Sequence, residues 1–351
     1  MKNKQKHCRI LSIDGGGIRG IIPGVVLTFL EAKLQKISGN NDARLADYFD
    51  LMAGTSTGGI LSCCYLLPDD KKKNKSKFSA EEVVNLYFEH GEDIFDRPFF
   101  HKVQSGGGLF DEKYPNRGFK ETLKKYMGNT WLSELIKPTL ITAYDVERRK
   151  THFFTQHDAQ KKGNDFLIKD VALSTAAAPT YFEATLIDDD LKRKYAFIDG
   201  GVFANNPTLC AYAEARNLFK KAERNKGVTA EDMYILSIGT GYAKETYPHL
   251  KVRNWGQAQW IKPLIDIMMT GVSETVDYQI RQIYDAIEKP ANYLRMDAPL
   301  PEFVSTEMDN AGKQNMAALH RQGQLLVEKF ETELQAFAEK IINADACERI
   351  A

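Results

Sequence analysis

The sequence lacks an excess of charge of either sign, because 47 lysines and arginines face 47 aspartates and glutamates among its 351 residues. Because the chain has no net positive charge, it has little long-range electrostatic attraction for polyanions. We therefore expect no nucleic-acid polymer as a partner. Cysteine is scarce too: five cysteines, an odd number without C-x-x-C spacing, argue against a disulfide framework and a zinc site. They are Cys8, Cys63, Cys64, Cys210 and Cys347. Since His152 and His157 also lack further ligands at suitable spacing, we expect neither a metal ion nor a cofactor.

Long apolar runs are absent as well. Nothing approaches the roughly 18 consecutive apolar residues of a membrane span, and the run at 60–67 has the length of a buried helix. The polar residues 1–7 lead into an apolar segment at 8–13 that is too short for a secretory signal. We therefore expect a soluble, cytoplasmic protein that at most lies peripherally on membranes.

Apolar strands and helical stretches alternate along the chain. Strands are expected at 8–13, 49–53, 139–144, 152–154, 195–198 and 233–238, with helices between them. This alternation is typical of a mainly parallel sheet with helices on both faces. Long amphipathic helices are expected at 261–287 and 313–342.

Two segments are predicted to be exposed loops. The lysine-rich stretch 71–77 has no apolar residue with which to pack, so it is either simply solvated or in contact with anionic lipid headgroups. Ser105 to Gly108 interrupt an aromatic-rich stretch from Phe95 to Tyr114, which we interpret as a mobile lid.

The first signal that carries chemistry is Gly54-x-Ser56-x-Gly58, between a strand and a helix. Glycines on both sides allow a turn so sharp that the serine hydroxyl is presented beside the helix N-terminus. The pattern alone is weak and occurs by chance, but with this flanking structure a nucleophile is a better interpretation than a structural turn.

The second signal is the run Gly15-Gly16-Gly17-Ile18-Arg19-Gly20, which also follows a strand and opens a helix. Exposed backbone N–H groups at such a place would bind a developing oxyanion. The same glycines satisfy the dinucleotide-binding pattern G-x-G-x-x-G. That alternative lacks its acidic residue at the end of a second strand, and a P-loop would need Lys and Ser or Thr where Ile21 and Ile22 stand.

The third signal is Asp199-Gly200-Gly201, directly after the strand at 195–198. A carboxylate at this strand end can reach the edge of the sheet that carries Ser56 and act as a base. An Asp-Gly turn alone is usually only a turn. The three signals in this order, together with Ile10 to Gly24, Leu51 to Ile60 and Ser174 to Phe182, resemble the patatin-like phospholipase family over roughly residues 8–241.

The resemblance implies a three-layer α/β/α patatin-like fold with a mainly parallel central sheet. Its catalytic domain would span residues 8–300, with the motifs within 11–212, and residues 301–351 would form a helical C-terminal extension packed on it. The family implies Ser56 as nucleophile, Asp199 as base, and an oxyanion hole from Gly15, Gly16, Gly17 and Arg19. A Ser-Asp dyad makes histidine dispensable, and the two histidines after Asp199, at 249 and 320, are poorly placed for a triad.

The implied activity is that of a metal-independent lipid acyl hydrolase of the phospholipase A or lysophospholipase type, which would contact membranes peripherally to reach phospholipids or other acyl-ester lipids. Two alternatives stay open. One is a catalytically weak storage or binding protein with the same fold. The other is a bacterial effector phospholipase activated by a cyclic dinucleotide, although the sequence contains no motif that would recognise such a ligand. The elements beyond Gly241 also leave a regulatory role or a homo-oligomer open.

Overall fold

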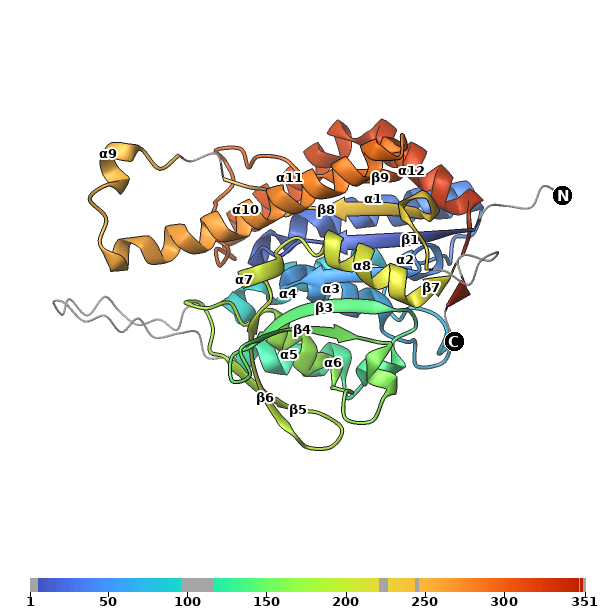
Figure 1. Cartoon of the computed structure of the whole chain (residues 1–351), viewed down its shortest axis with the longest axis horizontal. Coiled ribbons are helices and arrows are strands. Elements are labelled where there is room, and N and C mark those ends of the chain that lie inside the picture. The colour runs from blue at the N-terminus through green and yellow to red at the C-terminus, as the bar shows by residue number, and fades with distance from the viewer. Residues whose placement is uncertain (1–5, 96–116, 221–226, 244–245, 347, 350–351) are drawn as a thin grey trace.

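The computed structural model describes residues 6–95, 117–220, 227–243, 246–346 and 348–349, and it shows a sheet between layers of helices (Figure 1). Five parallel strands form its centre in the order β3–β2–β1–β8–β9. They are β1 (Lys6–Ile13), β2 (Leu51–Thr55), β3 (Thr139–Asp145), β8 (Met233–Ile238) and β9 (Tyr293–Met296). The α/β/α fold with a mainly parallel sheet is thereby confirmed.

The remaining strands lie at the margins. Three antiparallel strands extend the sheet beyond β3: β4 (Lys150–Thr155), β5 (Thr185–Asp188) and β6 (Lys194–Asp199). The short β10 (Asp345–Ala346) pairs with the start of β1, and β7 (Phe219–Lys220) with β11 (Glu348–Arg349).

Alternate side chains of the central strands supply two separate cores. On β1, Leu11 and Ile13 belong to the core on one face, whereas Cys8 and Ile10 belong to the core on the other. All four are fully buried, because successive residues of a strand point to opposite faces and both faces are covered by helices. Apolar residues therefore occur on both faces of β1, with Arg9 and Ser12 as buried polar residues among them.

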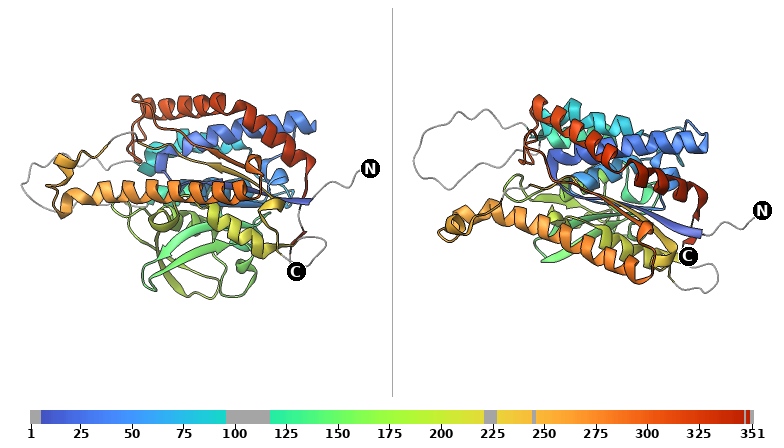
Figure 2. Two further views of the ribbon diagram at one scale, coloured as in Figure 1. Left: turned by 45° about the horizontal axis from the view of Figure 1, so that its top comes forward. Right: turned by 90° about the horizontal axis from the view of Figure 1, so that it is seen from above.

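One helix layer packs on the larger core and the other on the smaller. The first contains α1 (Ile21–Ser38), α3 (Thr57–Leu66), α4 (Ala80–Phe95), α5 (Arg117–Met127), α6 (Ile168–Thr175), α11 (Lys313–Lys329) and α12 (Glu331–Asn343). The second contains α8 (Thr208–Leu218) and α10 (Gln257–Ala286), visible below the sheet in the right view of Figure 2. Short helices are α2 (Leu45–Tyr48), α7 (Gly201–Ala204) and α9 (His249–Val252).

The helices beyond residue 301 share the larger core. Leu319 and Leu326 of α11 and Phe337 of α12 are buried in the same cluster as Leu11 of β1. No helix in the part of the chain that the structure describes is both long and apolar enough to cross a membrane.

The two segments expected to be exposed loops have different outcomes. Residues 71–77 connect α3 to α4 and are mostly exposed, at the end of α3 that lies away from Ser56. A ten-residue helix is about 15 Å long, so this stretch lies far from the end of the sheet that bears the motifs. The lid expected from Phe95 to Tyr114 falls, apart from Phe95 itself, outside the described residues.

Candidate active site

Ser56 stands on a strained turn between β2 and α3. Its backbone has φ 54° and ψ −123°, a conformation that L side chains rarely adopt. A β-carbon added at Gly54 would overlap the carbonyl of Gly58, and one added at Gly58 would overlap the carbonyl of Ile13. Both flanking positions therefore require glycine. The N–H of Ser56 donates to Oγ1 of Thr175, 2.8 Å away, which holds the turn from the side of α6.

The strand register brings Asp199 to Ser56. Thr55, the last residue of β2, pairs with Thr142 of β3, and Asp199, the last residue of β6, pairs with the next residue of β3, Ala143. The parallel β2 and the antiparallel β6 therefore approach the same point on β3 from opposite directions, and their ends meet there. Ser56 is the residue that follows Thr55, so the hydroxyl and the carboxylate are adjacent. The two residues singled out for catalysis are brought together.

The carboxylate of Asp199 is buried but not isolated. The backbone N–H of Gly201 donates to its Oδ1 over 2.7 Å. Burial raises the pKa of Asp199 to about 7, against the lowering effect of the nearby Ser56 hydroxyl and of the Gly201 N–H. A carboxylate with this pKa can accept a proton near neutral pH.

The glycine run lies beside Ser56, and its members have different roles. Gly16 and Gly17 line the same pocket as Ser56, and the structure gives neither of their N–H groups an acceptor among the described residues. The N–H of Gly15 instead donates to the carbonyl of Asn205 over 3.1 Å. Arg19 does not line this pocket; its Nε donates to the Gly16 carbonyl over 3.3 Å and one terminal nitrogen to the Gly241 carbonyl over 3.3 Å.

An ion-pair network behind the glycine run was not foreseen. Asp14, directly before the glycines, accepts two hydrogen bonds from Arg295 of β9, at 2.9 and 2.7 Å. Arg295 also donates to Asp297 over 2.8 Å and to Oγ of Ser237 over 2.9 Å. Asp14 and Arg295 are both buried, so this network fixes the start of the glycine run through charge-assisted bonds. Nothing in the spacing of the sequence links residue 14 to residue 295.

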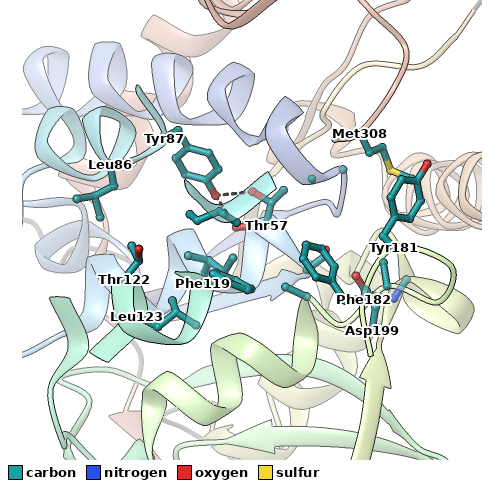
Figure 3. Close-up of a pocket in the computed structure, with 18 of the residues that line it drawn as sticks. Thr57, Leu86, Tyr87, Phe119, Thr122, Leu123, Tyr181, Phe182, Asp199 and Met308 are labelled. Atoms are coloured by element: carbon teal, nitrogen blue, oxygen red, sulfur yellow. Dashed lines mark hydrogen bonds between the residues drawn. The ribbon is translucent and has the colours of Figure 1, made fainter. Parts of the chain in front are cut away.

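The pocket in front of Ser56 is elongated and apolar, with a volume of ≈ 180 Å³. Figure 3 shows Asp199 at one end, and Leu86 of α4 and Leu123 of α5 at the other. Between them lie aromatic and aliphatic side chains, including those of Phe119 and Phe182. Such a lining has few polar groups to orient a sugar or a peptide, but it suits an aliphatic chain.

No histidine that the structure describes lines this pocket. His249 is exposed on α9, and His320 on α11 packs against Phe88. His152 lies in a cluster of aromatic rings, where burial lowers its pKa to about 4. Among residues 6–95, 117–220, 227–243, 246–346 and 348–349, no group of three or more His, Cys, Asp or Glu side chains is arranged to hold a metal ion.

The elbow at Ser56, the carboxylate at Asp199 and the glycine run define an α/β protein with a nucleophile elbow at the carboxyl ends of its strands. Residues 11–212 match the model of the family described as patatin-like phospholipase. The chain is 34% identical to Patatin-T5 of Solanum tuberosum, covering 91% of this chain and 83% of the relative. The protein therefore belongs to the patatin-like phospholipase family.

Two further relatives show how widely the similarity extends. Patatin-like protein 3 of Arabidopsis thaliana is 32% identical over 97% of this chain and 87% of its own length. The Solanum tuberosum protein named "Probable inactive patatin-3-Kuras 1" is 33% identical, covering 92% of this chain and 87% of the relative. Because a relative of similar identity bears the word inactive in its name, overall similarity does not decide activity, and the site itself must be considered.

Proposed function

We propose that the protein is a lipid acyl hydrolase of the phospholipase A or lysophospholipase type, with Ser56 as nucleophile and Asp199 as base. The observation that carries this proposal is the placement of Ser56, on its sharp turn, directly beside the buried Asp199 carboxylate, with both residues lining one apolar pocket. An acyl chain in that pocket would place its ester carbonyl at the hydroxyl.

The reaction needs no group beyond those of the chain and a water molecule. As Oγ of Ser56 bonds to the carbonyl carbon, Asp199 accepts the hydroxyl proton. When the tetrahedral intermediate collapses, the bond to the alcohol oxygen breaks and that oxygen takes the proton from Asp199. Water then attacks the acyl-serine, gives a proton to Asp199, and the fatty acid leaves as this proton returns to Ser56.

The N–H groups of Gly16 and Gly17 are the donors that we assign to the developing oxyanion. Both line the pocket beside Ser56 and both lack a protein acceptor among the described residues. Gly15 and Arg19 complete the oxyanion hole as positioning residues, because their hydrogen bonds go to backbone carbonyls that hold the loop. Donors fixed in this way stabilise the transition state without reorganising.

The substrates would be phospholipids or other acyl-ester lipids, reached at a membrane surface from the cytoplasm. This proposal is supported by the apolar lining of the pocket, in which the methylene groups of an acyl chain are removed from water. A storage or binding protein would share the pocket but has no need of a buried carboxylate beside the elbow serine. We therefore favour catalysis.

The decisive experiment measures fatty acid release from a mixed phospholipid extract. Wild-type protein should release fatty acid, and Ser56→Ala and Asp199→Asn should not, while both variants keep the wild-type circular dichroism spectrum. A fluorophosphonate probe should label Ser56 alone. Labelling at another residue, or unchanged release by either variant, would refute the assignment.

The same assay separates the regulated alternative from the constitutive one. A panel of cyclic dinucleotides is added to the wild-type protein and to Ser56→Ala. Release only in the presence of one of them would identify a ligand-activated effector. Ester hydrolysis absent under every condition, with no fluorophosphonate labelling, would instead favour the storage or binding role.

A further inference from the structure

Helix α9 and the first half of α10 extend past the carboxyl ends of the parallel strands, at the end of the molecule that carries Ser56 (Figure 1). We call residues 246–272 the α9–α10 arm. Figure 2 shows the same projection in two further orientations, so the arm is not an effect of one view. It stands next to the pocket rather than on the body of the protein.

The arm has many apolar residues, but none of those whose exposure is described is buried in a core. Leu250, Ile261 and Leu264 are 71%, 47% and 48% exposed. The second half of the same helix behaves in the ordinary way, since Ile280 and Tyr284 are completely buried against the sheet. Exposed apolar side chains grouped on a projecting helix indicate an interaction site.

The exposed face of the arm is continuous with the pocket. Ile261, Leu264, Ile265 and Met268 follow one another at i, i+3, i+4 and i+7, which places them on one side of the helix. Of these, Ile265 and Met268 line the pocket of Ser56 together with Met269. The same stripe therefore forms part of the pocket wall and extends outward from it.

The remaining side chains of the arm match a lipid–water boundary. Tyr247, Trp255 and Trp260 form a chain of rings with centroids 5.5 and 5.1 Å apart. Such amphipathic rings favour the level of lipid headgroups. The arm has Lys251, Arg253 and Lys262 against one acidic residue, Asp266, which accepts a hydrogen bond from the Tyr247 hydroxyl, although the whole chain is neutral. Cations concentrated beside an apolar stripe complement an anionic bilayer surface.

We propose that the α9–α10 arm is the surface with which the protein docks on anionic lipid bilayers, so that the pocket opens onto the membrane. The inference rests on the proposed function, because it explains how a lipid substrate reaches Ser56. A second copy of the chain is a poorer occupant, since a two-fold interface through this face would bring the cations Lys251 and Arg253 of both copies together. The lysine-rich stretch 71–77 lies at the other end of α3 and is not part of this surface.

The test uses the double variant Ile261→Ser/Leu264→Ser, which leaves the pocket-lining residues unchanged. Its matched control is Leu186→Ser/Leu191→Ser, where two leucines are 59% and 43% exposed on the β5–β6 hairpin at the other edge of the sheet. Binding to vesicles of phosphatidylcholine with about one third phosphatidylserine is measured by sedimentation, with Ser56→Ala in each background so that the lipid stays intact. Hydrolysis of a short monomeric ester and of the vesicle lipid is measured with Ser56 present.

The arm variant should bind these vesicles at least about tenfold more weakly and lose vesicle hydrolysis in proportion, while monomeric ester hydrolysis stays within about twofold of the wild-type rate. The control variant should keep all three properties. Replacing Lys251 and Arg253 by glutamine should weaken binding to the anionic vesicles, and binding of the unaltered arm should fall with added salt.

Unchanged vesicle binding by the arm variant would overturn the docking surface. So would an arm-dependent dimer in sedimentation equilibrium, if its loss in the variant left vesicle binding intact. The outcome for the proposed function is separate, because a wild-type protein that binds vesicles through the arm but hydrolyses neither ester would refute catalysis and not docking.

Discussion

Ester hydrolysis should depend on pH through the carboxylate of Asp199, because only its ionised form can accept the serine proton. Burial raises the pKa of this group to about 7, whereas an exposed aspartate would titrate near 3.8. The active form therefore predominates above about pH 7, and activity falls as the pH drops through this value. At about pH 5 only ~1% of Asp199 would be ionised, so kcat/KM should lie ~100-fold below its plateau.

The assay is hydrolysis of a soluble, uncharged short-chain ester from about pH 4.5 to 9, which separates the chemistry from lipid docking. Values of kcat/KM report the titration of the free enzyme, so the midpoint belongs to the unliganded site. Fluorophosphonate labelling of Ser56 should follow the same curve. Circular dichroism at each pH shows that the protein remains folded, and Asp199→Asn should give a low rate without this midpoint.

A rate that stays on its plateau down to about pH 5 would refute the reasoning, because it would mean an ordinary aspartate pKa or a base other than Asp199. A midpoint near 7 that persists in Asp199→Asn would also refute it. Such a result would point to a histidine, whose usual pKa lies in the same range.

No single histidine should be essential for ester hydrolysis, because none that the structure describes lines the pocket. A hundredfold or greater loss of kcat/KM in a folded variant, about 3 kcal/mol of transition-state stabilisation, would instead indicate a triad. The variants are His7→Gln, His90→Gln, His101→Gln, His152→Gln, His157→Gln, His249→Asn and His320→Asn, of which His101 lies outside the described residues. Ser56→Gly should be more stable to urea than Ser56→Ala by ~1 kcal/mol, since glycine relieves the positive φ; equal midpoints would contradict this strain. Arg295→Met should cost ~3–5 kcal/mol of unfolding free energy, because Asp14 would be left buried without its cation, and Asp14→Asn in the same chain should restore part of the loss. A loss below about 1 kcal/mol would show that the pair is unimportant.

The parts of the site that could be predicted from sequence are those that a local pattern enforces. A turn as sharp as that at Ser56 needs glycine at both flanks, so the constraint is visible within five residues. The same is true of the apolar strand before it, which is buried on both faces and therefore continuous. The proximity of Asp199 to Ser56 depends on strand register, which the sequence does not show. The prediction of Asp199 as the base therefore relied on the three motifs occurring together, not on geometry.

The parts that could not be predicted depend on contacts between distant segments. Strand β9 has only four residues and contains Arg295, so nothing in its sequence marks a buried strand. Arg295 can be buried because Asp14 and Asp297 neutralise it, and its pairing with Asp14, 281 residues away, is one that no periodicity reveals. The N–H of Gly15 is likewise occupied by a carbonyl 190 residues away, which a pattern of glycines cannot indicate.

The glycine run and the elbow pack directly against each other and against the segment after Asp199. A β-carbon at Gly58, in the elbow, would meet the carbonyl of Ile13 at the end of β1, and one at Gly15 would lie 2.5 Å from Oδ1 of Asn205 and 3.2 Å from the β-carbon of Ser56. Gly15 thus makes room for Ser56, the nucleophile of another motif, and for Asn205, six residues after Asp199. A larger side chain at Gly15 or Gly58 would displace these neighbours, so the close packing holds the glycine run and the nucleophile in fixed relative positions.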